Sequence, residues 1–353
     1  MMLAGRLEKE EFSAAFKKLI DRHESLRTYF SVINGVEVQR IKKTNEVFFK
    51  IEYYENNEWN KSAAGDLQHG ICTLDSVNRI IERFIRPFDL AQAPLFRVGL
   101  FRFPHWFPGL SAAENSGEER FMLMIDMHHI ISDGASMGVL IRDFTAIYRG
   151  EELPPLKIQY KDFAGWQDSR KKEEETRKQE AYWLEQFSGK LPALRLPTDF
   201  PRTAIRNTAG RTLFFEIEGE TTAALKRMVI DQETTLYIIL LTFYYVFLKK
   251  VSSQEDIVIG TPTAGRLHPD LEPVIGMFVN TLGLRNYPRG DMSFREFLAG
   301  VKKHTLAAFG NQDFQFEDLV EKLDINRDMS RNVLFDTMFS LQNIEIGEIK
   351  IPG

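Results

Sequence analysis

Two adjacent histidines followed by an Asp-Gly pair are the residues of this chain whose types and spacing best suit acid–base chemistry. Three residues separate His128 and His129 from Asp133 and Gly134. A neutral imidazole, with an ordinary pKa of about 6.5, accepts a proton at physiological pH and passes it on. Gly134 lets the chain turn, and its backbone N–H is a donor that suits a developing oxyanion.

The four residues are expected to differ in role because their side chains point in different directions. Adjacent residues that leave a strand cannot face the same way, so His128 and His129 cannot do the same job. Asp133 cannot reach either histidine without a sharp bend of the backbone, which favours an ion pair with an arginine elsewhere. A single histidine at a strand end is more often a satisfied core residue than a catalyst, and that alternative stays open.

Metal binding and serine-hydrolase chemistry both fit these residues poorly. The paired histidines have no third ligand at a usual spacing, so no metal site is expected. Ser132 and Ser136 lie in no Gly-x-Ser-x-Gly turn. Cys72 is the single cysteine, which excludes an internal disulfide and predicts an inert, partly buried thiol in a reducing compartment.

The apolar run 121–127 is expected to position the histidines. A nearly continuous run of this kind is typical of a strand buried on both faces. Beyond Gly134, apolar residues at helical spacing from Val139 to Tyr148 predict a helix that ends at Gly150. The cluster therefore lies between a strand and a helix, at the carboxyl end of the strand.

The remaining chain alternates between predicted helices and strands, so the expected class is α/β, built as α+β two-layer sandwiches. Asn34-Gly35 is predicted to be the two-residue turn of a hairpin. Opposite charges four residues apart predict a solvated helix over 168–180, and the prolines of 191–201 predict a linker between lobes. Further helices are expected over 12–23, 78–85, 221–230, 236–250 and 294–309, and strands over 95–103, 212–218, 256–263, 277–285 and 334–342.

The composition fits a soluble globular protein with two lobes. The 353 residues are 43% hydrophobic and 27% charged, with a net charge of -5. That charge argues against nucleic acid as the main partner and leaves small substrates and proteins open. A charged run follows the first five residues in place of a signal sequence, and the apolar stretch 236–248 is too short to cross a bilayer. A cytoplasmic protein without a membrane partner is expected.

Residues 128–136 resemble the HHxxxDG signature of condensation domains of nonribosomal peptide synthetases, in the chloramphenicol acetyltransferase-like superfamily. Six further segments resemble the other motifs of that family, in the family's order. The first of them, RHESLRT, matches the pattern RHExLRT; Phe163 and Val333 replace the family's tyrosine and proline in two others. The six segments are 22–28, 86–97, 160–167, 260–285, 304–320 and 327–335.

The resemblance implies a fold and a reaction. It implies two lobes, 1–185 and 186–353, in a V with the active site at their junction, and it implies that the family's first strand and helix and its final elements are absent here. The implied reaction is amide bond formation between a donor aminoacyl or peptidyl thioester and an acceptor aminoacyl thioester. Both substrates would be carried on phosphopantetheine arms of donor and acceptor carrier protein domains, beside an adenylation domain, with no directly bound cofactor.

The resemblance also implies a role for each residue of the site. His129 is expected to orient the acceptor amine and take its proton, with the Gly134 N–H near the tetrahedral oxygen and His128 packed. Asp133 is expected to pair with Arg285 and hold the turn. Packing and tunnel roles are both open for Tyr160, Trp166 and Asn280. The residues expected at the substrate tunnel or floor loop are Ser136, Tyr160, Trp166, Met277 and Asn280.

Several alternatives remain on the same residues. Epimerization domains share HHxxxDG but usually carry a tryptophan shortly after the following serine, where this chain has Met137 to Leu140. Heterocyclization domains have DxxxxD instead of the signature. A coenzyme A-dependent acyltransferase and a non-catalytic carrier-docking or recruitment remnant stay open. The residues Ile130-Ile131-Ser132 and Ala135-Ser136 resemble those of condensation domains that accept a donor of L configuration.

Overall fold

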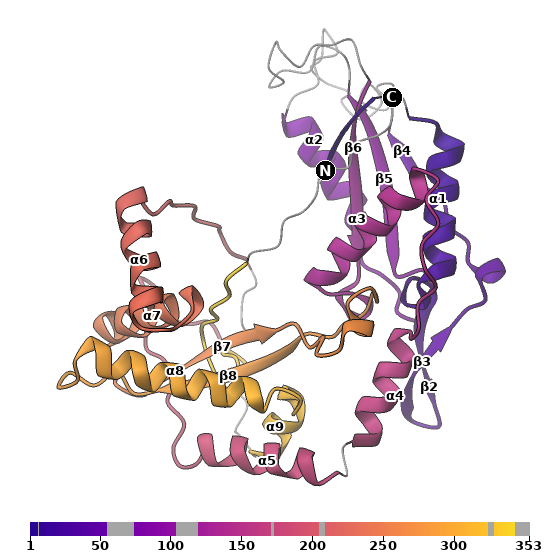
Figure 1. Cartoon of the computed structure of the whole chain (residues 1–353). Helices are drawn as coiled ribbons and strands as arrows, with labels where there is room; N and C mark the ends of the chain where they lie inside the picture. Colours follow the sequence, from indigo (N-terminus) through magenta and orange to yellow (C-terminus); the bar gives the residue numbers. More distant parts are fainter. Residues whose placement is uncertain are drawn as a thin grey trace. The chain divides into compact units, whose positions relative to one another are not determined.

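A computed structural model of the chain describes residues 1–5, 7–54, 74–103, 119–170, 173–204, 209–323 and 328–342. The chain forms two compact units (Figure 1). In the described residues, the first unit contains Met1–Trp166 and Arg266–Phe278, and the second contains Gln167–Gly265 and Val279–Asn343. The segment Arg266–Phe278 therefore belongs to the first unit, although the residues before and after it in the sequence belong to the second.

The first unit is built on a mixed four-stranded sheet in the order β1-β6-β5-β4. β6 (Arg120–Met127) pairs antiparallel with both β1 (Met2–Ala4) and β5 (Phe96–Phe103). β4 (Glu52–Tyr54) pairs parallel with β5. The predicted strands 95–103 and 121–127 are thus neighbours in one sheet, and His128 follows the end of β6.

Helices cover both faces of this sheet because side chains along β5 alternate between two cores. Val98 and Leu100 join the core formed with α1 (Lys9–Arg22) and α3 (Gly134–Tyr148). Phe101 and Phe103 join a second core with α2 (Leu74–Phe84). β6 likewise contributes to the cores on both faces of the sheet, as the apolar run 121–127 predicted, and α1 and α3 lie side by side (Figure 1).

A hairpin of β2 (Thr28–Ile33) and β3 (Val36–Ile41) confirms the predicted turn. Asn34 and Gly35 have φ angles of 54° and 78°, the left-handed values that a two-residue type I′ turn needs at both central positions. Ile33 and Val36, the residues on either side of the turn, are paired directly across the hairpin. The first unit also contains the short helices η1 (Glu24–Arg27), η2 (Thr44–Glu46), η5 (His129–Ile131) and η6 (Pro269–Leu271).

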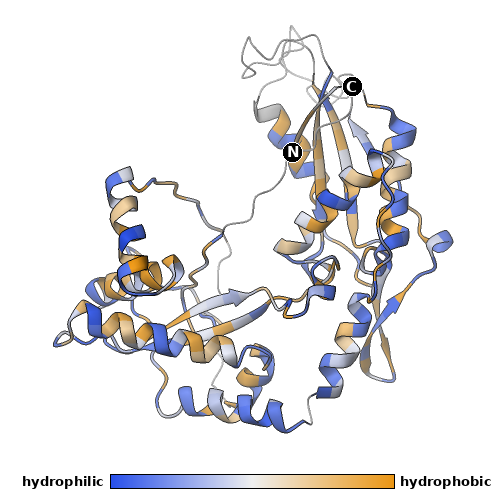
Figure 2. Ribbon diagram, viewed as in Figure 1, coloured by the Kyte–Doolittle hydropathy of each residue, from blue (hydrophilic) through white to orange (hydrophobic). Residues whose placement is uncertain are grey.

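The second unit packs helices around a two-stranded antiparallel sheet of β7 (Ile257–Thr263) and β8 (Asn280–Asn286). Its core contains Ile239 and Tyr245 of α7 (Leu236–Ser252) and Ile259 of β7. The apolar α7 and the hydrophilic α5 contrast clearly in Figure 2. The other helices of this unit are α5 (Glu174–Gln186), α6 (Gly219–Asp231), α8 (Phe294–Gly310) and α9 (Phe316–Lys322).

Two predicted strands of the second unit are wrong. Residues 209–218 have no regular structure and are exposed throughout, with Phe214 92% exposed. Within 334–342 the structure has only an isolated parallel bridge between Met338 and Gly260. Apolar and β-branched residues favour a strand only where a partner strand accepts their backbone hydrogen bonds, and the described residues place no such ladder there.

The predicted helix over 168–180 is two helices, and the expected boundary between residues 185 and 186 lies inside the second unit. α4 (Tyr160–Arg170) ends before α5 begins, and the Glu173 N–H closes the turn on the Arg170 carbonyl at 2.9 Å. Glu174 and Lys178 form the expected pair, 3.2 Å apart. α5 belongs to the second unit because Trp183 is buried in that unit's core, as is Leu194 of the expected linker.

No single helix among the described residues is long and apolar enough to cross a membrane. α6 and α7 meet the length and composition criteria only as a pair, and that pair is bent by 111°. Cys72, predicted to be an inert thiol, lies outside the described residues.

Candidate functional site

The loop between β6 and α3 is held by hydrogen bonds that its own residues make. His128 is extended, and its Nδ1 accepts the Ile130 N–H at 3.1 Å, which starts the single turn of η5. Asp133 is the N-cap of α3, and its Oδ1 accepts the Ser136 N–H at 2.8 Å. Asp is among the preferred N-cap residues because its carboxylate satisfies a free N–H of the first turn. Strand, turn and helix thus follow the predicted order.

The two histidines differ in exposure, as their adjacent positions predicted. His128 is half-buried, and its ring meets Phe88 edge-on with 6.2 Å between the ring centroids. Since its Nδ1 accepts a hydrogen bond, the proton of neutral His128 is assigned to Nε2. His129 is exposed, and its imidazole makes no hydrogen bond to any described residue. Within this loop His129 is the imidazole available to a substrate.

Asp133 forms a buried, bidentate ion pair with Arg266. The Arg266 guanidinium donates to Oδ2 at 2.6 Å and to Oδ1 at 3.0 Å, and the two side chains are 6% and 0% exposed. Oδ2 also accepts the Phe278 N–H at 3.1 Å, and the Ser136 hydroxyl shares its one proton between Oδ1 at 2.8 Å and the Gly276 carbonyl at 2.9 Å. With the cap bond, five donors surround this carboxylate, which is how a protein stabilises a buried charge.

The expected pairing of Asp133 with Arg285 is therefore wrong. Arg285 lies on β8 in the second unit and donates to both carboxylate oxygens of Asp256, at 2.9 and 2.7 Å. Arg285 is opposite Val258 in the sheet, so Asp256, the residue directly before β7, is its diagonal neighbour. The hydrogen bond to Asp256 raises the pKa of Arg285. Arg285 also donates to the carbonyls of residues 186, 188 and 190, so it fastens the end of α5.

Gly134 is the first residue of α3 and is exposed. A helix leaves its first N–H groups without intrahelical partners, and these groups form the positive end of the helix dipole. The Asp133 cap takes the Ser136 N–H, and no described residue accepts the Gly134 N–H. A Cβ at Gly134 would meet nothing within 4 Å. The position thus combines a free donor with open space.

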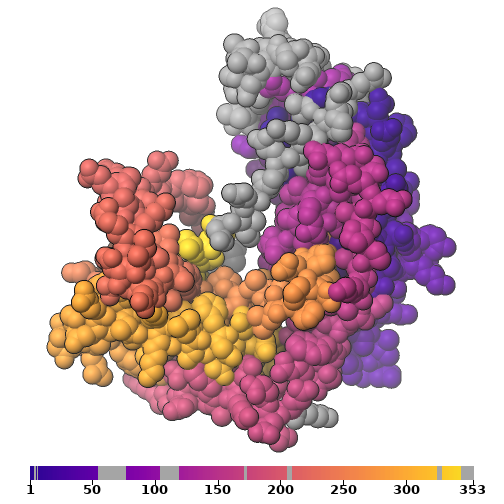
Figure 3. Space-filling model, viewed as in Figure 1, coloured from indigo at the N-terminus to yellow at the C-terminus, as the bar shows by residue number. Residues whose placement is uncertain are grey.

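The residues expected at the tunnel or floor loop fall into two groups. Ser136, Tyr160 and Met277 meet in the first unit, where the Tyr160 hydroxyl donates to the Met277 carbonyl at 2.9 Å. Ser136 is 0% exposed, so it supports the segment Arg266–Phe278 and lines no open surface. Trp166 is 48% exposed and packs on Phe163, with ring centroids 5.7 Å apart. Figure 3 shows the segment's orange atoms against the magenta surface of the same unit.

Asn280 has a packing role in the second unit. Its side chain is buried, and its Nδ2 donates to the carbonyls of Gln312 and Phe314 at 2.7 and 2.8 Å. Its Oδ1 accepts the Phe316 N–H at 3.2 Å. Asn280 therefore fastens the connection between α8 and α9 to β8, and the packing alternative for this residue is supported.

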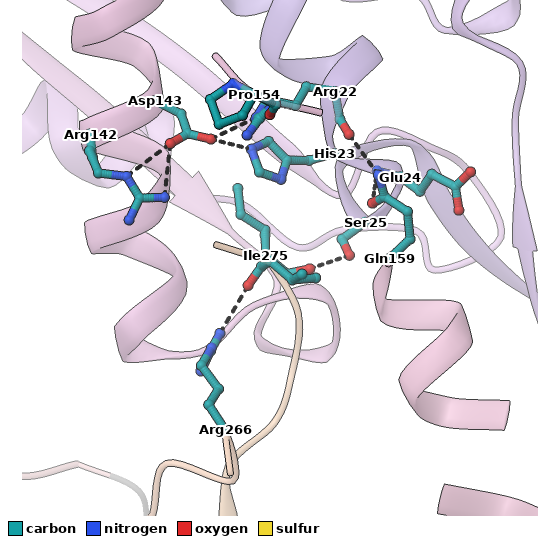
Figure 4. A network of polar contacts seen from close by, with 11 residues as sticks. Arg22, His23, Glu24, Ser25, Arg142, Asp143, Pro154, Gln159, Arg266 and Ile275 are labelled. Carbon is teal, nitrogen blue, oxygen red and sulfur yellow. Dashed lines mark hydrogen bonds and ion pairs between the residues drawn. The ribbon is translucent and has the colours of Figure 1, made fainter. Parts of the chain in front are cut away.

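A charged cluster that no sequence pattern predicted joins the end of α1 to α3. His23 Nε2 and Arg22 Nε lie 3.0 and 2.9 Å from Asp143 Oδ2, and Arg142 donates to Oδ1 (Figure 4). Burial lowers the pKa of His23 and outweighs the opposite effect of Asp143. Burial raises the pKa of Asp143, but hydrogen bonds from His23 and Arg22 outweigh burial and lower it overall. Arg22 and His23 appear in the RHESLRT segment, whereas nothing local marks Asp143.

Metal ligands do not gather in the described part of the chain, where no three His, Cys, Asp or Glu side chains group closely enough to hold an ion. In this loop the Asp133 carboxylate is engaged by Arg266 and Phe278, whereas the His129 imidazole and the Gly134 N–H have no hydrogen-bond partner among the described residues. These two groups offer a proton acceptor and a hydrogen-bond donor, the pair that an addition to a carbonyl carbon requires.

Comparison with known sequences finds one family along nearly the whole chain. The family model described as Condensation domain matches residues 1–350. Bacitracin synthase 3 of Bacillus licheniformis is 45% identical over 353 residues, which are 100% of this chain and 5% of that synthase. Gramicidin S synthase 2 of Aneurinibacillus migulanus is 45% identical over 98% of this chain and 7% of its own length. The chain thus corresponds to a small part of these relatives.

Solved structures confirm the predicted fold class. The X-domain from teicoplanin biosynthesis has a TM-score of 0.77 at 24% identity, over 96% of this chain and 71% of that chain. The first condensation domain of the calcium-dependent antibiotic synthetase, in complex with a substrate analogue, has a TM-score of 0.67 at 18% identity. That match covers 99% of this chain and 76% of the other. At these identities the likeness establishes the mixed α/β fold.

Proposed function

Because this chain belongs to the condensation domain family, we propose that it forms a peptide bond between two thioesters of nonribosomal peptide synthesis. The donor is an aminoacyl or peptidyl thioester and the acceptor an aminoacyl thioester. Each is held on the phosphopantetheine arm of a carrier protein domain, with an adenylation domain adjoining. The observation that carries the proposal is the exposed His129 imidazole in one loop with the free Gly134 N–H.

The acceptor amine attacks the donor thioester carbonyl, so a C–N bond forms and the C–S bond breaks. The amine loses one proton, and the departing thiolate takes one up. An α-amine has a pKa of about 8, so a useful fraction is unprotonated at neutral pH and the reaction depends mainly on positioning. His129 orients the amine and accepts its proton. The Gly134 N–H, at the positive end of α3, donates to the tetrahedral oxygen.

Transfer of a labelled aminoacyl group between two loaded carrier proteins tests this function. We expect dipeptide formation with the unchanged chain and a fall of about a hundredfold or more in its rate for His129→Ala. His268→Ala is the matched control, because His268 is also exposed and outside the loop, and it should keep the parent rate. A parent chain that binds carrier proteins without forming dipeptide would favour the docking alternative instead.

Gly134→Ala probes the proposed donor without disturbing the fold. The added methyl group has open space, and alanine is a better helix former than glycine, so the thermal midpoint should be equal or higher. The same methyl group would crowd a carbonyl that approaches the N–H, so dipeptide formation should slow by about tenfold or more. Gly138→Ala, also on α3 with no atom within 4 Å of the new Cβ, is the control. Equal rates for both variants would remove Gly134 from the mechanism.

A further inference from the structure

The segment Val274–Phe278 is buried in the first unit although it forms no helix or strand. Val274 is 0% and Ile275 1% exposed. Buried peptide groups outside regular structure need hydrogen-bond partners from elsewhere, because an unpaired buried carbonyl or N–H costs free energy. The segment is therefore stable only where side chains of other elements reach its backbone.

Four consecutive carbonyls of this segment each accept a hydrogen bond from a different side chain. The hydrogen bonds are Arg266 to Val274 at 3.2 Å, Ser25 to Ile275 at 2.5 Å, Ser136 to Gly276 at 2.9 Å and Tyr160 to Met277 at 2.9 Å. We call this set the carbonyl ladder. Its donors come from η1, α3, α4 and the start of Arg266–Phe278 itself, so the ladder ties four parts of the first unit together.

The ladder ends at the carboxylate that caps α3. Phe278, the next residue, donates its N–H to Asp133, and Arg266 donates to the same side chain. Asp133 directly precedes Gly134, so a shift of the ladder moves the groups that hold the first turn of α3. Positional changes of this kind alter reaction rates strongly when the displaced group faces the reacting atoms.

Ser25 is the ladder donor whose position the RHExLRT pattern leaves open. It is 3% exposed, and its hydroxyl spans 250 residues of sequence to reach the Ile275 carbonyl. The preceding residues are fastened to α3 and to the residue before α4, because His23 bonds to Asp143 and the Glu24 N–H donates to the Gln159 side chain (Figure 4). The contacts of His23 and Glu24 therefore fix the backbone next to Ser25, and the Ser25 hydroxyl donates to the Ile275 carbonyl.

We propose that Ser25 is a positioning residue for peptide-bond formation, which acts through the Ile275 carbonyl on the carbonyl ladder and so on Asp133 and Gly134. The inference rests on the proposed function. It assigns Ser25 no contact with substrate, so loss of its hydroxyl should lower kcat and leave the KM for loaded carrier proteins unchanged.

Ser25→Ala in the full chain, with Ser31→Ala as control, tests the inference. Ser31 also has a buried hydroxyl in the first unit, but that oxygen has no hydrogen-bond partner among the described residues. We expect Ser25→Ala to lower kcat about three- to tenfold, the factor that one hydrogen bond represents, and Ser31→Ala to keep the parent value. Amide hydrogen exchange at Gly276 and Phe278 should accelerate in Ser25→Ala alone.

A second variant, Tyr160→Phe, removes another donor of the ladder while keeping the ring, and it should also accelerate exchange at Phe278. Unchanged kcat in Ser25→Ala would overturn the positioning role, as would a kcat loss that only follows a loss of folded protein. If the parent chain forms no dipeptide, the proposed function fails, and the positioning role fails with it. The exchange measurements still decide separately whether Ser25 holds the segment.

Discussion

At the scale of single residues, the HHxxxDG loop divides into groups without a hydrogen-bond partner among the described residues and groups that hold the loop. His129 and Gly134 keep an unused imidazole and an unused N–H, whereas the His128 ring and the Asp133 carboxylate are engaged. The division follows from burial. A carboxylate at 0% exposure must be paired, while an exposed imidazole is satisfied by water until a substrate replaces it.

Arg266→Ala should destabilise the first unit strongly. It leaves the Asp133 carboxylate buried without its ion-pair partner, which typically costs about 3–5 kcal/mol. Arg266→Lys should recover only part of that loss, because a lysine ammonium cannot make the bidentate contact. Denaturant unfolding monitored by circular dichroism measures the change. Asp133→Asn combined with Arg266→Ala should lose less than the sum of the single variants, and strict additivity would contradict the pair.

At the scale of elements, the buried cluster of His23 and Asp143 joins η1 to α3. His23 is 1% exposed, its Nε2 faces Asp143, and its Nδ1 is buried with no hydrogen-bond partner among the described residues. The guanidinium groups of Arg22 and Arg142 also lie on the Asp143 carboxylate. A proton on Nδ1 would place a further positive charge among these groups, with no acceptor for the new N–H.

The stability of the first unit should therefore fall in mild acid. Burial lowers the folded-state pKa of His23 below its ordinary value of about 6.5. Between these two pKa values the unfolded chain binds a proton that the folded chain does not, so stability is lost as the pH falls below about 6.5. One such proton corresponds to about 1.4 kcal/mol per pH unit. Urea unfolding of the parent and of His23→Gln, between pH 5 and pH 8, measures the difference.

The glutamine variant is informative because its amide keeps a donor for Asp143 but does not titrate. It should lose some stability at pH 8 and show a flatter decline in acid than the parent. His268→Gln is the control, because the His268 side chain is 67% exposed and its replacement removes no buried imidazole. Parallel declines of the parent and His23→Gln would show that other groups determine the acid sensitivity.

At the scale of the whole molecule, the described residues form one large hydrophobic core in each unit, and the sequence between β7 and β8 contributes to the first unit's structure. Leu241, Tyr245 and Ile259 are buried in the second core, with Leu100 and Leu123 in the first. Arg266–Phe278 belongs to the first unit even though the strands on either side belong to the second. When one unit unfolds locally, the boundary between unfolded and folded residues should therefore lie near residues 265 and 279.

Leu241→Ala should reveal that division. Leu241 is 0% exposed, and a Leu-to-Ala change in a core costs about 2–5 kcal/mol. Amide hydrogen exchange should accelerate in α7, β7 and β8, whereas the amides of Gly276 and Phe278 should stay protected with β5 and β6. Leu123→Ala, in the first core, should give the opposite pattern. Accelerated exchange at Gly276 in Leu241→Ala would assign the segment to the second unit.

The sequence by itself determined the features that neighbouring residues build. The turn at Asn34 and Gly35 and the strand–loop–helix order around His129 depend on residues a few positions apart, so both patterns can be recognised in the chain. Most of the predicted helices and the central strands formed for the same reason. The strand at 212–218 did not, because a strand requires a partner that its own residues do not specify.

Only the tertiary structure decided which distant groups meet. Several arginines suit Asp133 chemically, and Arg266 and Arg285 both lie in the segment 260–285, which resembles a family motif. The pairing of β7 with β8 brings Arg285 into an ion pair with Asp256. The path of Arg266–Phe278 through the first unit brings Arg266 into an ion pair with Asp133. The contact of Ser25 with Ile275 likewise depends on the folded backbone. An ion pair or hydrogen bond between distant residues is selected by the topology that brings them together, and residue type alone leaves that choice open.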